Sequence, residues 1–400
     1  MATAGEEEPV GGQRLRWGEL PPLPAPFGQE KQIGVAGPFV GVHNGALIVA
    51  GGASFPKAPP WRGGEKAWWD DVFVLFRIPG EAPRYQWLID RSFKLPRPLA
   101  YGVSISTGEG VVCIGGCDAE RCYREVFLIE WDPSVKRIAI DTLPPLPRPL
   151  AFMAGAMVGR TVYVAGGQEA VKDAEATKNF WALDLSKGSD RAAFQWKELP
   201  AWPGPARVVP LAVGLTDGAT EGFHLFSGRN VAPGKATEIL KDAYVFRPRT
   251  TGAWTRLGDI APKGERARCV MAGTAIAASP SGGFLAPGRA ILVIGGADGR
   301  KLLELEDLGK QIEKAKGTPQ EKALEALKSE ILENHPGFSR DVLAYDPKTD
   351  TWTKAGEFPT GSHVTTTAVE WEGAIVIPSG EIRPGVRSPK VWQAASPRGE

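Results

Sequence analysis

An apolar segment that ends in a pair of small residues recurs six times along this 400-residue chain. Such recurrence predicts an architecture built from one repeated unit, and this restricts the possible folds more than composition does. Glycine at the end of each segment permits a positive φ and close backbone packing there. The pair is Gly-Gly in four copies and Ser-Gly in two. The copies are ALIVAGG (46–52), GVVCIGG (110–116), TVYVAGG (161–167), GFHLFSG (222–228), AILVIGG (290–296) and AIVIPSG (374–380).

Each copy leads, after a variable stretch, to a second apolar segment, a turn and a segment that usually carries tryptophan. The second segments are DDVFVLF (70–76), REVFLIEWD (124–132), KNFWALDL (178–185), KDAYVFRP (241–248), RDVLAYDP (340–347) and SPKVWQA (388–394). The tryptophans are Trp87, Trp196, Trp254 and Trp352, and RIAI (137–140) takes this place in the second copy. Four short strands per unit are typical of a propeller blade, and the Gly-Gly plus Trp pattern resembles the kelch repeat. We predict an all-β fold, a six-bladed kelch β-propeller over residues 1–400 as a single domain.

The two ends of the chain indicate how the ring closes. The chain stops shortly after 388–394, so the sixth blade lacks an outer strand. An unassigned segment, RLRWGELPPLP (14–24), precedes the first unit and carries Trp17 at the aromatic position. We predict that a strand at about residues 14–19 completes the last blade, because closure removes the free edges that make sheets aggregate.

Long, varied loops follow the small-residue pairs, at 53–69, 229–240, 297–339 and 381–388. Up-and-down strands place these loops on one face, where function usually resides. The longest loop carries apolar residues at helical spacing. They are Leu305, Leu308 and Ile312, then Ala323, Leu327 and Ile331. Gly317-Thr318-Pro319 interrupts the pattern, with Thr318 as the expected N-cap. We predict a helical hairpin at about residues 301–335, over that face.

Composition argues against several ligand classes. Lys and Arg number 47 and Asp and Glu 46, so there is no positive surplus of the kind that attracts nucleic acid or a membrane surface. The longest uncharged run, 269–288, contains Pro280 and Pro287, unlike a membrane helix. Residues 1–12 lack the pattern of a signal peptide. We therefore expect neither nucleic acid nor a membrane as a partner, and the oligomeric state stays open.

Metal-binding patterns are missing from the sequence. The four histidines are scattered, and the four cysteines are too few for a disulfide framework. Cys113, Cys117 and Cys122 lie close together in sequence, and we interpret them as structural. We expect no metal and no cofactor.

Arginine recurs where the chain leads into the innermost strand of a blade. These residues are Arg97, Arg148, Arg207 and Arg268. Inner strands surround the central channel, so the guanidiniums could converge there and grip a carboxylate in bidentate fashion. The alternative is that they form ion pairs at the rim. An acidic position also recurs, which argues for a structural role such as loop capping. It holds Asp71, Glu125, Asp242 and Asp341, with Asn179 in the third copy.

The segment SGEIRPGVR (379–387) combines opposite charges at one point. Glu381 directly follows the Ser-Gly pair, and Pro384-Gly385 turns the loop back so that Arg387 approaches the same space. In such a pair the carboxylate could act as a general base while the guanidinium binds an anionic group of the ligand. The alternative is a loop salt bridge.

The whole chain resembles the kelch-type N-acetylneuraminate epimerases, or sialic acid mutarotases, and in particular their cyclically permuted group. The resemblance rests on the helical insertion, on LAYDPKTDTW (343–352) and on GE-x-x-PG-x-R (380–387). It rests also on ALIVAGGASF (46–55) and LPRPLAYGVS (95–104), which are similar to late blades of the non-permuted enzymes. A closed ring tolerates a rotated blade order because permutation only moves the opening.

The resemblance implies an isomerase that interconverts the α and β anomers of N-acetylneuraminate, or a related acidic sugar, by cofactor-free acid/base ring opening. It implies Glu381 and Arg387 as the catalytic pair, with Arg268 or Arg207 helping to hold the sugar carboxylate. Trp68 and Trp69 are candidates for an apolar wall. Arg383 departs from the family motif, and it and the first loop could alter which sugar fits.

A non-catalytic kelch module could bind a protein partner through the loop face and the hairpin. A copper-radical oxidase needs a Cys, Tyr and His cluster that this sequence does not assemble. The resemblance implies a periplasmic location if a signal peptide was removed, and a cytoplasmic one otherwise.

Overall fold

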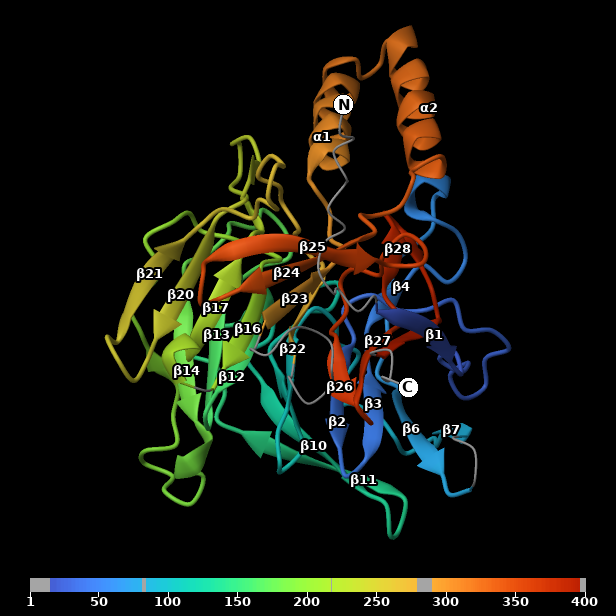
Figure 1. Ribbon diagram of the computed structural model, residues 1–400. Coiled ribbons are helices and arrows are strands. Elements are labelled where there is room, and N and C mark those ends of the chain that lie inside the picture. The colour runs from blue at the N-terminus through green and yellow to red at the C-terminus, as the bar shows by residue number, and fades with distance from the viewer. Residues whose placement is uncertain (1–14, 81–83, 217, 279–289, 396–400) are drawn as a thin grey trace, which may run out of the picture.

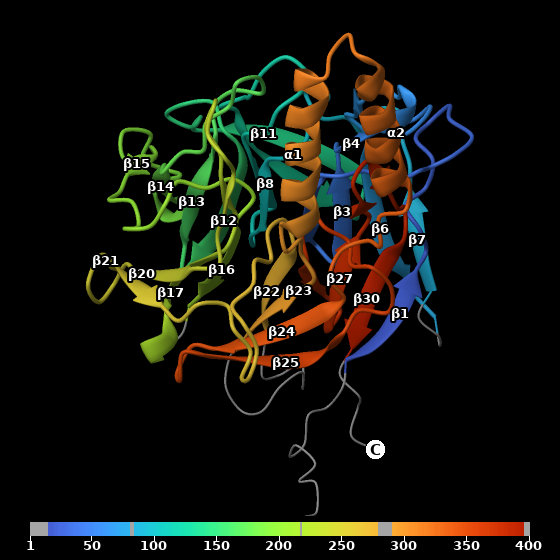
Figure 2. The same ribbon diagram turned by 90° about the horizontal axis from the view of Figure 1, so that it is seen from above.

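The computed structural model of the protein describes residues 15–80, 84–216, 218–278 and 290–395. Six four-stranded antiparallel sheets stand around a common axis, as Figures 1 and 2 show. At five of the six junctions between blades, the first strand of one blade contacts the first strand of the next, which places these strands around the channel. The six-bladed propeller predicted from the repeat is therefore confirmed.

The strands follow the predicted order within each blade, with small shifts of their bounds. Blade one holds β2 (Phe39–His43), β3 (Ala46–Ala50), β6 (Val72–Ile78) and β7 (Arg84–Leu88). Blade two holds β8 (Val103–Ser106), β9 (Val111–Ile114), β10 (Val126–Asp132) and β11 (Arg137–Leu143). Blade three holds β12 (Ala151–Val158), β13 (Thr161–Gln168), β14 (Phe180–Asp184) and β15 (Lys197–Glu198). Blade four holds β16 (Leu211–Leu215), β17 (Gly222–Phe226), β20 (Ala243–Arg247) and β21 (Ala253–Leu257). Blade five holds β22 (Thr274–Ala278), β23 (Ala290–Ile294), β24 (Asp341–Asp346) and β25 (Thr351–Glu357).

The ring closes through both ends of the chain. Blade six holds β26 (Val369–Trp371), β27 (Ala374–Pro378) and β30 (Val391–Ala395), and β1 (Arg16–Leu20) is its outermost strand. β1 pairs antiparallel with β30 in the register Arg16 to Ala395. This is the position predicted for the N-terminal strand, although residue 14 and the segment before it lie outside the described residues.

Short elements occupy the loops that follow the small-residue pairs and a few other turns. The two-stranded ribbons are β4 (Ala53–Ser54) with β5 (Ala67–Trp68), β18 (Arg229–Asn230) with β19 (Glu238–Ile239), and β28 (Glu381–Arg383) with β29 (Val386–Arg387). The 3₁₀ turns are η1 (Pro60–Arg62), η2 (Leu185–Lys187) and η3 (Gly218–Thr220).

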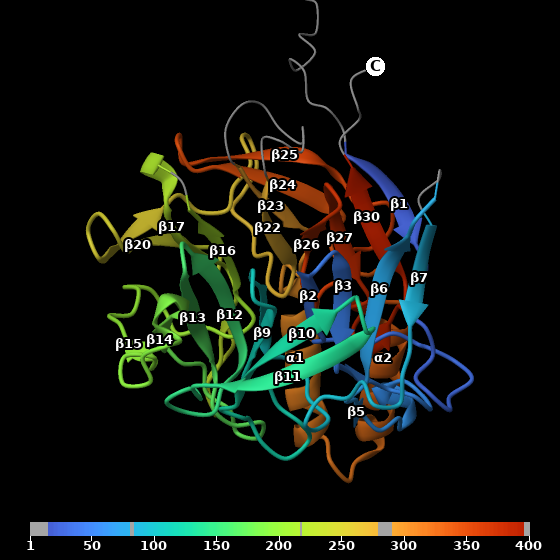
Figure 3. The same ribbon diagram turned by 90° about the horizontal axis from the view of Figure 1, so that it is seen from below.

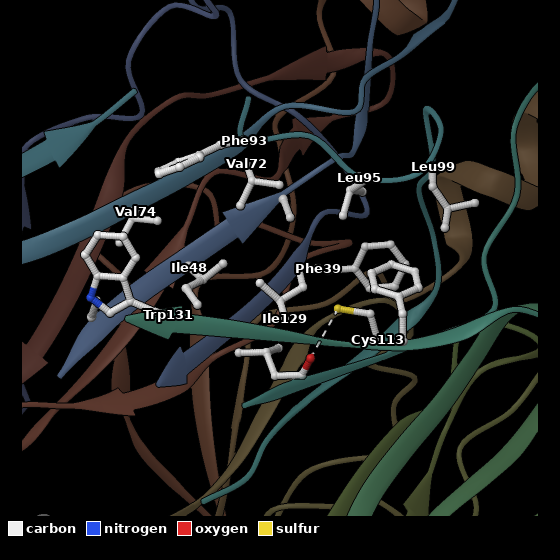
Figure 4. Close-up of a cluster of buried hydrophobic side chains, with 14 of the residues drawn as sticks. Phe39, Ile48, Val72, Val74, Phe93, Leu95, Leu99, Cys113, Ile129 and Trp131 are labelled. Carbon is white, nitrogen blue, oxygen red and sulfur yellow. Dashed lines mark hydrogen bonds between the residues drawn. The ribbon is translucent and has the colours of Figure 1, made fainter. Parts of the chain in front are cut away.

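The hydrophobic core lies between neighbouring blades. Figure 4 shows one such interface, where Phe39 and Val74 of blade one meet Ile129 and Trp131 of blade two. Viewed from below, the faces of adjacent sheets turn toward one another around the ring (Figure 3). Burial of these alternating side chains is what stabilises each blade against its neighbour.

Three of the recurring tryptophans tie an outer strand to the preceding blade, whereas Nε1 of Trp17 and of Trp352 is buried and makes no hydrogen bond. In these three, the indole Nε1 donates to a proline carbonyl of the segment that leaves the blade before it. These bonds join Trp87 to Pro21 at 2.9 Å, Trp196 to Pro144 at 2.8 Å and Trp254 to Pro200 at 2.8 Å. A tryptophan and a Leu-Pro segment therefore recur together because one supplies the donor and the other the acceptor.

The small-residue pairs are required by contact with the next blade. The first residue of each pair has a left-handed backbone, for example φ of 57° at Gly115 and 73° at Gly166. A Cβ at Gly115 would lie 2.4 Å from the Leu150 carbonyl oxygen, which no side chain tolerates. At the two Ser-Gly pairs the hydroxyl makes the connection instead. Ser227 Oγ accepts from Val270 N at 2.9 Å, and Ser379 Oγ accepts from Val35 N at 2.8 Å.

Replacing Ser379 by alanine is expected to destabilise the protein by about 1–3 kcal/mol, because it leaves the buried Val35 N–H without its acceptor. The hydroxyl also donates toward Val35 O and Ser388 O, and the seam between blades six and one depends on it. Chemical unfolding measures the loss. The exposed Ser134, replaced by alanine, is the control and should change the free energy of unfolding little. Equal effects of the two substitutions would contradict the role given to Ser379.

Six equivalent backbone positions form a closed hydrogen-bonded ring around the channel. Each N–H donates to the carbonyl of the equivalent residue in the preceding blade, at 2.6–3.0 Å. All six have a left-handed φ, from 48° to 67°. These residues, here called the channel ring, are Gly37, Tyr101, Phe152, Val209, Ala272 and Thr365. Left-handed Val209 and Thr365 are unusual because β-branched residues rarely adopt that conformation, and such strain is retained where the surroundings fix it.

The helical hairpin consists of α1 (Arg300–Lys314) and α2 (Pro319–Glu333), close to the predicted limits of 301–335. Figure 1 shows it standing on one face of the ring. Thr318 is the N-cap residue of α2, but its hydroxyl donates to Ala315 O and makes no capping hydrogen bond. The end of α2 is tied to the first loop, since Trp61 Nε1 donates to Glu333 Oε2 at 2.8 Å. In the described part of the chain, no helix has the length and apolar character needed to cross a bilayer.

Two buried histidines predict a loss of stability in mild acid. Burial lowers the pKa of His224 and of His363 to about 4. In the unfolded chain these histidines bind protons near pH 6.5, whereas in the folded protein they stay neutral until about pH 4. The free energy of unfolding therefore has its full value above pH 6.5 and decreases as the pH drops toward 4. Each histidine is expected to contribute on the order of 2 kcal/mol of this loss by pH 5. Urea unfolding at pH 7.5 and pH 5 measures it, and equal midpoints would contradict it.

Candidate functional site

A cavity of about 1680 Å³ opens on the face that carries the long loops. Its floor is formed by channel-ring residues, including Tyr101, Phe152 and Thr365, and residues near the start of α1 line one side. The residue directly after each small-residue pair, here called the post-pair position, supplies much of the wall. Five of the six post-pair residues line the cavity, namely Cys117, Gln168, Arg229, Ala297 and Glu381, and the sixth is Ala53.

Backbone pairing fixes every post-pair residue in the same way. Each forms an antiparallel bridge with the residue that immediately precedes a channel-ring residue, for example Val364 with Glu381 and Val208 with Arg229. The fold therefore presents six equivalent positions to one cavity. Which chemistry appears there depends on the side chain that each blade places at this position.

Glu381 and Arg387 meet across the short β28–β29 ribbon, where they are register partners. Arg387 Nη1 lies 3.0 Å from Glu381 Oε1, and the side chains are 3% and 17% exposed. Glu381 Oε1 also accepts from Gly385 N at 2.7 Å, so the Pro-Gly turn orients the carboxylate. The Arg387 guanidinium packs on the Phe55 ring at 4.8 Å. Both residues line the cavity, as the spacing predicted.

The cavity wall contains several buried hydrogen-bond donors that lack acceptors. Within the described residues, Nε of Arg387, Nε of Arg229 and Nε1 of Trp68 are buried and make no hydrogen bond. Buried polar groups are normally paired, and an unpaired donor carries a desolvation cost. A cavity with unpaired donors favours a ligand rich in acceptor oxygens.

The cavity is also positively charged, although the chain is nearly neutral. Nine lysines and arginines line it against six aspartates and glutamates. Lys66 lies 4.5 Å from the centre of the Tyr101 ring and 5.3 Å from that of Trp68, which forms a cationic and aromatic patch on one wall. Such a patch suits a ligand that combines an apolar face with negative charge.

Only some residues predicted for the site reach the cavity. Arg268 and Trp68 line it together with Glu381 and Arg387. Arg268 is already engaged by Asp341 and Glu265. Trp69 is not among the lining residues, and its Nε1 donates to Ser54 Oγ at 2.8 Å. Arg383 donates to the Glu333 carbonyl at 2.5 Å and holds the hairpin in place.

The recurring arginines do not converge on the cavity, apart from Arg268. Arg97 pairs with Glu125 at 3.1 Å, and Arg148 donates to Asn179 Oδ1 at 2.6 Å. Arg207 is fully buried and pairs with Asp242 at 2.8 Å. The recurring arginine thus meets the recurring acidic or amide position of its own blade. The acidic position has the structural role that its recurrence predicted, but as an ion-pair partner and not as a loop cap.

The remaining candidates are placed as follows. Cys113 lies in the core between blades one and two. Cys117 and Cys122 face each other across a single antiparallel bridge, and a hydrogen bond with Cys122 together with burial raises the pKa of Cys117. All four cysteines are free thiols. Over the described ranges, no group of three or more His, Cys, Asp and Glu side chains is arranged to hold a metal ion.

The sequence alone did not indicate that Arg229, Lys66, Tyr101 and Phe152 line the cavity. A signal for Arg229 existed, because it follows Ser227-Gly228 as Glu381 follows Ser379-Gly380. The two pairs that depart from Gly-Gly are the two that precede a charged post-pair residue. Lys66, Tyr101 and Phe152 had no such signal, since their contacts depend on loop conformation.

Comparison with known proteins places the chain in a family. The family model of N-acetylneuraminate epimerase matches residues 2–138 and 143–398. The N-acetylneuraminate epimerase of Pasteurella multocida is 28% identical over 247 residues, which are 62% of this chain and 57% of that protein. That of Brucella melitensis is 36% identical over 130 residues, 29% of this chain and 30% of that protein. In these alignments the chain spans less than three fifths of the relatives' length.

A solved structure has the same fold. The structure of YjhT aligns over 94% of this chain and 95% of its own, with a TM-score of 0.58 and 14% identity. Whether the blade order is rotated relative to these proteins stays a prediction. The family model covers nearly the whole chain, and the chain belongs to the N-acetylneuraminate epimerase family.

Proposed function

We propose that the protein interconverts the α and β anomers of N-acetylneuraminate, or of a related acidic sugar, by ring opening and closure in this cavity. The observation that carries the proposal is the Glu381–Arg387 pair on the cavity wall, with a buried Arg387 Nε that makes no hydrogen bond. The names of the relatives, N-acetylneuraminate epimerases, agree with it.

Arg387 is suited to hold the sugar carboxylate. Its guanidinium is almost fully buried and fixed between Glu381 and the Phe55 ring. Its Nε is buried and makes no hydrogen bond, and a carboxylate bound beside it would supply the missing acceptor. Because the carboxylate of such a sugar is attached to the anomeric carbon, binding it places the reacting carbon beside Glu381.

Glu381 is suited to move the proton. In the proposed reaction its carboxylate takes the proton of the anomeric hydroxyl while a carbonyl forms and the bond to the ring oxygen breaks. The ring oxygen receives that proton back as the ring opens. Rotation of the open ketone followed by the reverse steps closes the ring on the other face. One positioned carboxylate serves as base and then as acid, and no electron transfer is required.

The aromatic patch would bind the rest of the sugar. Trp68 and Tyr101 present apolar surface beside Lys66, and the Trp68 Nε1 is a free buried donor for a hydroxyl. Arg268 lies in the cavity but is engaged by two carboxylates, so we assign it to the electrostatic field of the site and not to direct binding.

The test is anomer exchange followed by NMR. Freshly released α-N-acetylneuraminate is mixed with the protein at a pH where spontaneous exchange is slow, and the decay of the α signal is recorded with and without protein. Acceleration that grows in proportion to protein concentration supports the proposal. If the α signal decays equally fast with and without protein, for N-acetylneuraminate and for other 2-keto acidic sugars, the proposal is wrong.

A further inference from the structure

A second charged side chain faces the cavity from a position equivalent to that of Glu381. Arg229 is the post-pair residue of blade four, and its backbone bonds to Val208 in both directions, at 3.1 and 2.9 Å. Its counterpart Glu381 bonds to Val364 in the same pattern. The two residues stand two blades apart around the channel, so their side chains enter the cavity from different sides.

Arg229 lacks a good counter-charge. Its Nε is buried and makes no hydrogen bond. Its nearest carboxylate among the described residues is Glu306 of α1, 4.0 Å from Nη1 and already accepting from Thr237 Oγ1 at 3.0 Å. Burial lowers the pKa of Arg229 from its ordinary value. By contrast, the buried Arg207 has a bidentate carboxylate partner.

The two charged positions line one cavity, with a small post-pair residue between them. Blade five lies between blades four and six, and its post-pair residue is Ala297, which offers only a methyl group. The cavity volume of about 1680 Å³ exceeds the roughly 300–1000 Å³ common for small-molecule pockets. The cavity therefore has room for more than the sugar ring that Glu381 and Arg387 would engage.

We propose that Arg229 forms a second anion site of this cavity, and that the preferred substrate is an acidic sugar with a second anionic group remote from its anomeric carbon. This inference rests on the proposed function. The first anion meets Arg387 beside Glu381, and the second meets Arg229 across the gap left by Ala297. The second anion could be another sugar carboxylate or a phosphate ester, because a guanidinium can donate two parallel hydrogen bonds to either.

The test compares three probes: N-acetylneuraminate, its reducing α2→8-linked dimer, and N-acetylneuraminate 9-phosphate. Anomer exchange by NMR gives kcat/KM for each, and titration calorimetry gives binding without relying on catalysis. We expect Arg229→Gln to lower the ratio of kcat/KM for a dianionic probe to that for N-acetylneuraminate by about tenfold or more, the loss typical of one charge-assisted hydrogen bond. Which dianionic probe shows this loss tells whether carboxylate or phosphate is the second anion.

Two further variants make the result specific. Arg266→Gln removes one charge from an exposed arginine on the same cavity, so it should leave the ratio near its wild-type value. Glu306→Gln removes the carboxylate near Arg229 and should raise the ratio, which tests the site even if Arg229→Gln folds poorly.

The outcomes separate this inference from the proposed function. An unchanged ratio in Arg229→Gln, or an equal fall in Arg266→Gln, would overturn the second anion site while anomer exchange stands. Exchange of N-acetylneuraminate but of neither dianionic probe would overturn it too. If no probe is exchanged, the proposed function fails, but calorimetry still tests the second anion site. Weaker binding of the dianionic probes to Arg229→Gln than to the wild type supports the site, and equal binding contradicts it.

Discussion

Replacing Glu381 by glutamine is expected to slow anomer exchange by about 10²–10⁴-fold, the usual contribution of a positioned general base. Glutamine keeps the shape of the side chain and an oxygen that can accept from Gly385 N, so the ribbon geometry should persist. It cannot take a proton from the anomeric hydroxyl. The rate constant is measured by NMR at saturating N-acetylneuraminate and expressed per folded protein, with the folded fraction taken from circular dichroism.

The control for Glu381→Gln is Glu304→Gln. Glu304 is an exposed carboxylate of α1 that lines the same cavity, so its substitution changes the cavity charge equally without touching the proposed proton transfer. We expect this variant to exchange anomers at a rate near that of the wild type. Full activity in Glu381→Gln, or equal losses of activity in both variants, would contradict the assignment of Glu381 as the general base.

Repetition made most of the fold predictable. Each strand, turn and glycine pair could be compared with five other copies, so a weak local pattern became a strong one. The N-terminal strand was predictable for the same reason, because Trp17 marked a missing outer strand in blade six. The helical hairpin was predictable because its apolar spacing differed from that of every repeat.

The candidate site was less predictable, because repetition and function leave opposite signals. Arg97, Arg148 and Arg207 recur, and recurrence reflects a contact that every blade needs, here an ion pair or hydrogen bond within the blade. The charged post-pair residues, Glu381 and Arg229, are instead those at which one blade differs from the others. Positions at which one blade differs from the others therefore indicate the residues of the site better than positions that all blades share.

Contacts made by the long loops could not be inferred from the sequence at all. Lys66 approaches Trp68 and Tyr101 only because the β4–β5 ribbon folds over the channel ring. Arg383 reaches Glu333 of α2 from a different loop. Both contacts join segments without a repeated counterpart, so no comparison between copies could reveal them.

Replacing Arg207 by methionine is expected to destabilise the protein by about 3–5 kcal/mol. The guanidinium is fully buried, donates to Asp242 at 3.1 and 2.8 Å and to the Ser227 carbonyl at 2.9 Å, and packs near Trp202. Methionine fills similar space but leaves the largely buried Asp242 carboxylate without its counter-charge and the Ser227 carbonyl without this donor. Chemical unfolding followed by tryptophan fluorescence measures the change in the free energy of unfolding.

The repeat supplies a matched control for Arg207→Met at the equivalent position of blade two. Arg97 and Glu125 form the same ion pair with side chains 38% and 46% exposed, so Arg97→Met should cost about 0–1 kcal/mol. Adding Asp242→Leu to Arg207→Met should restore much of the lost stability, because a buried pair replaced by apolar side chains is often neutral. Equal losses at Arg97 and Arg207, or no recovery in the double variant, would mean that burial of the unpaired Asp242 carboxylate is not the cause.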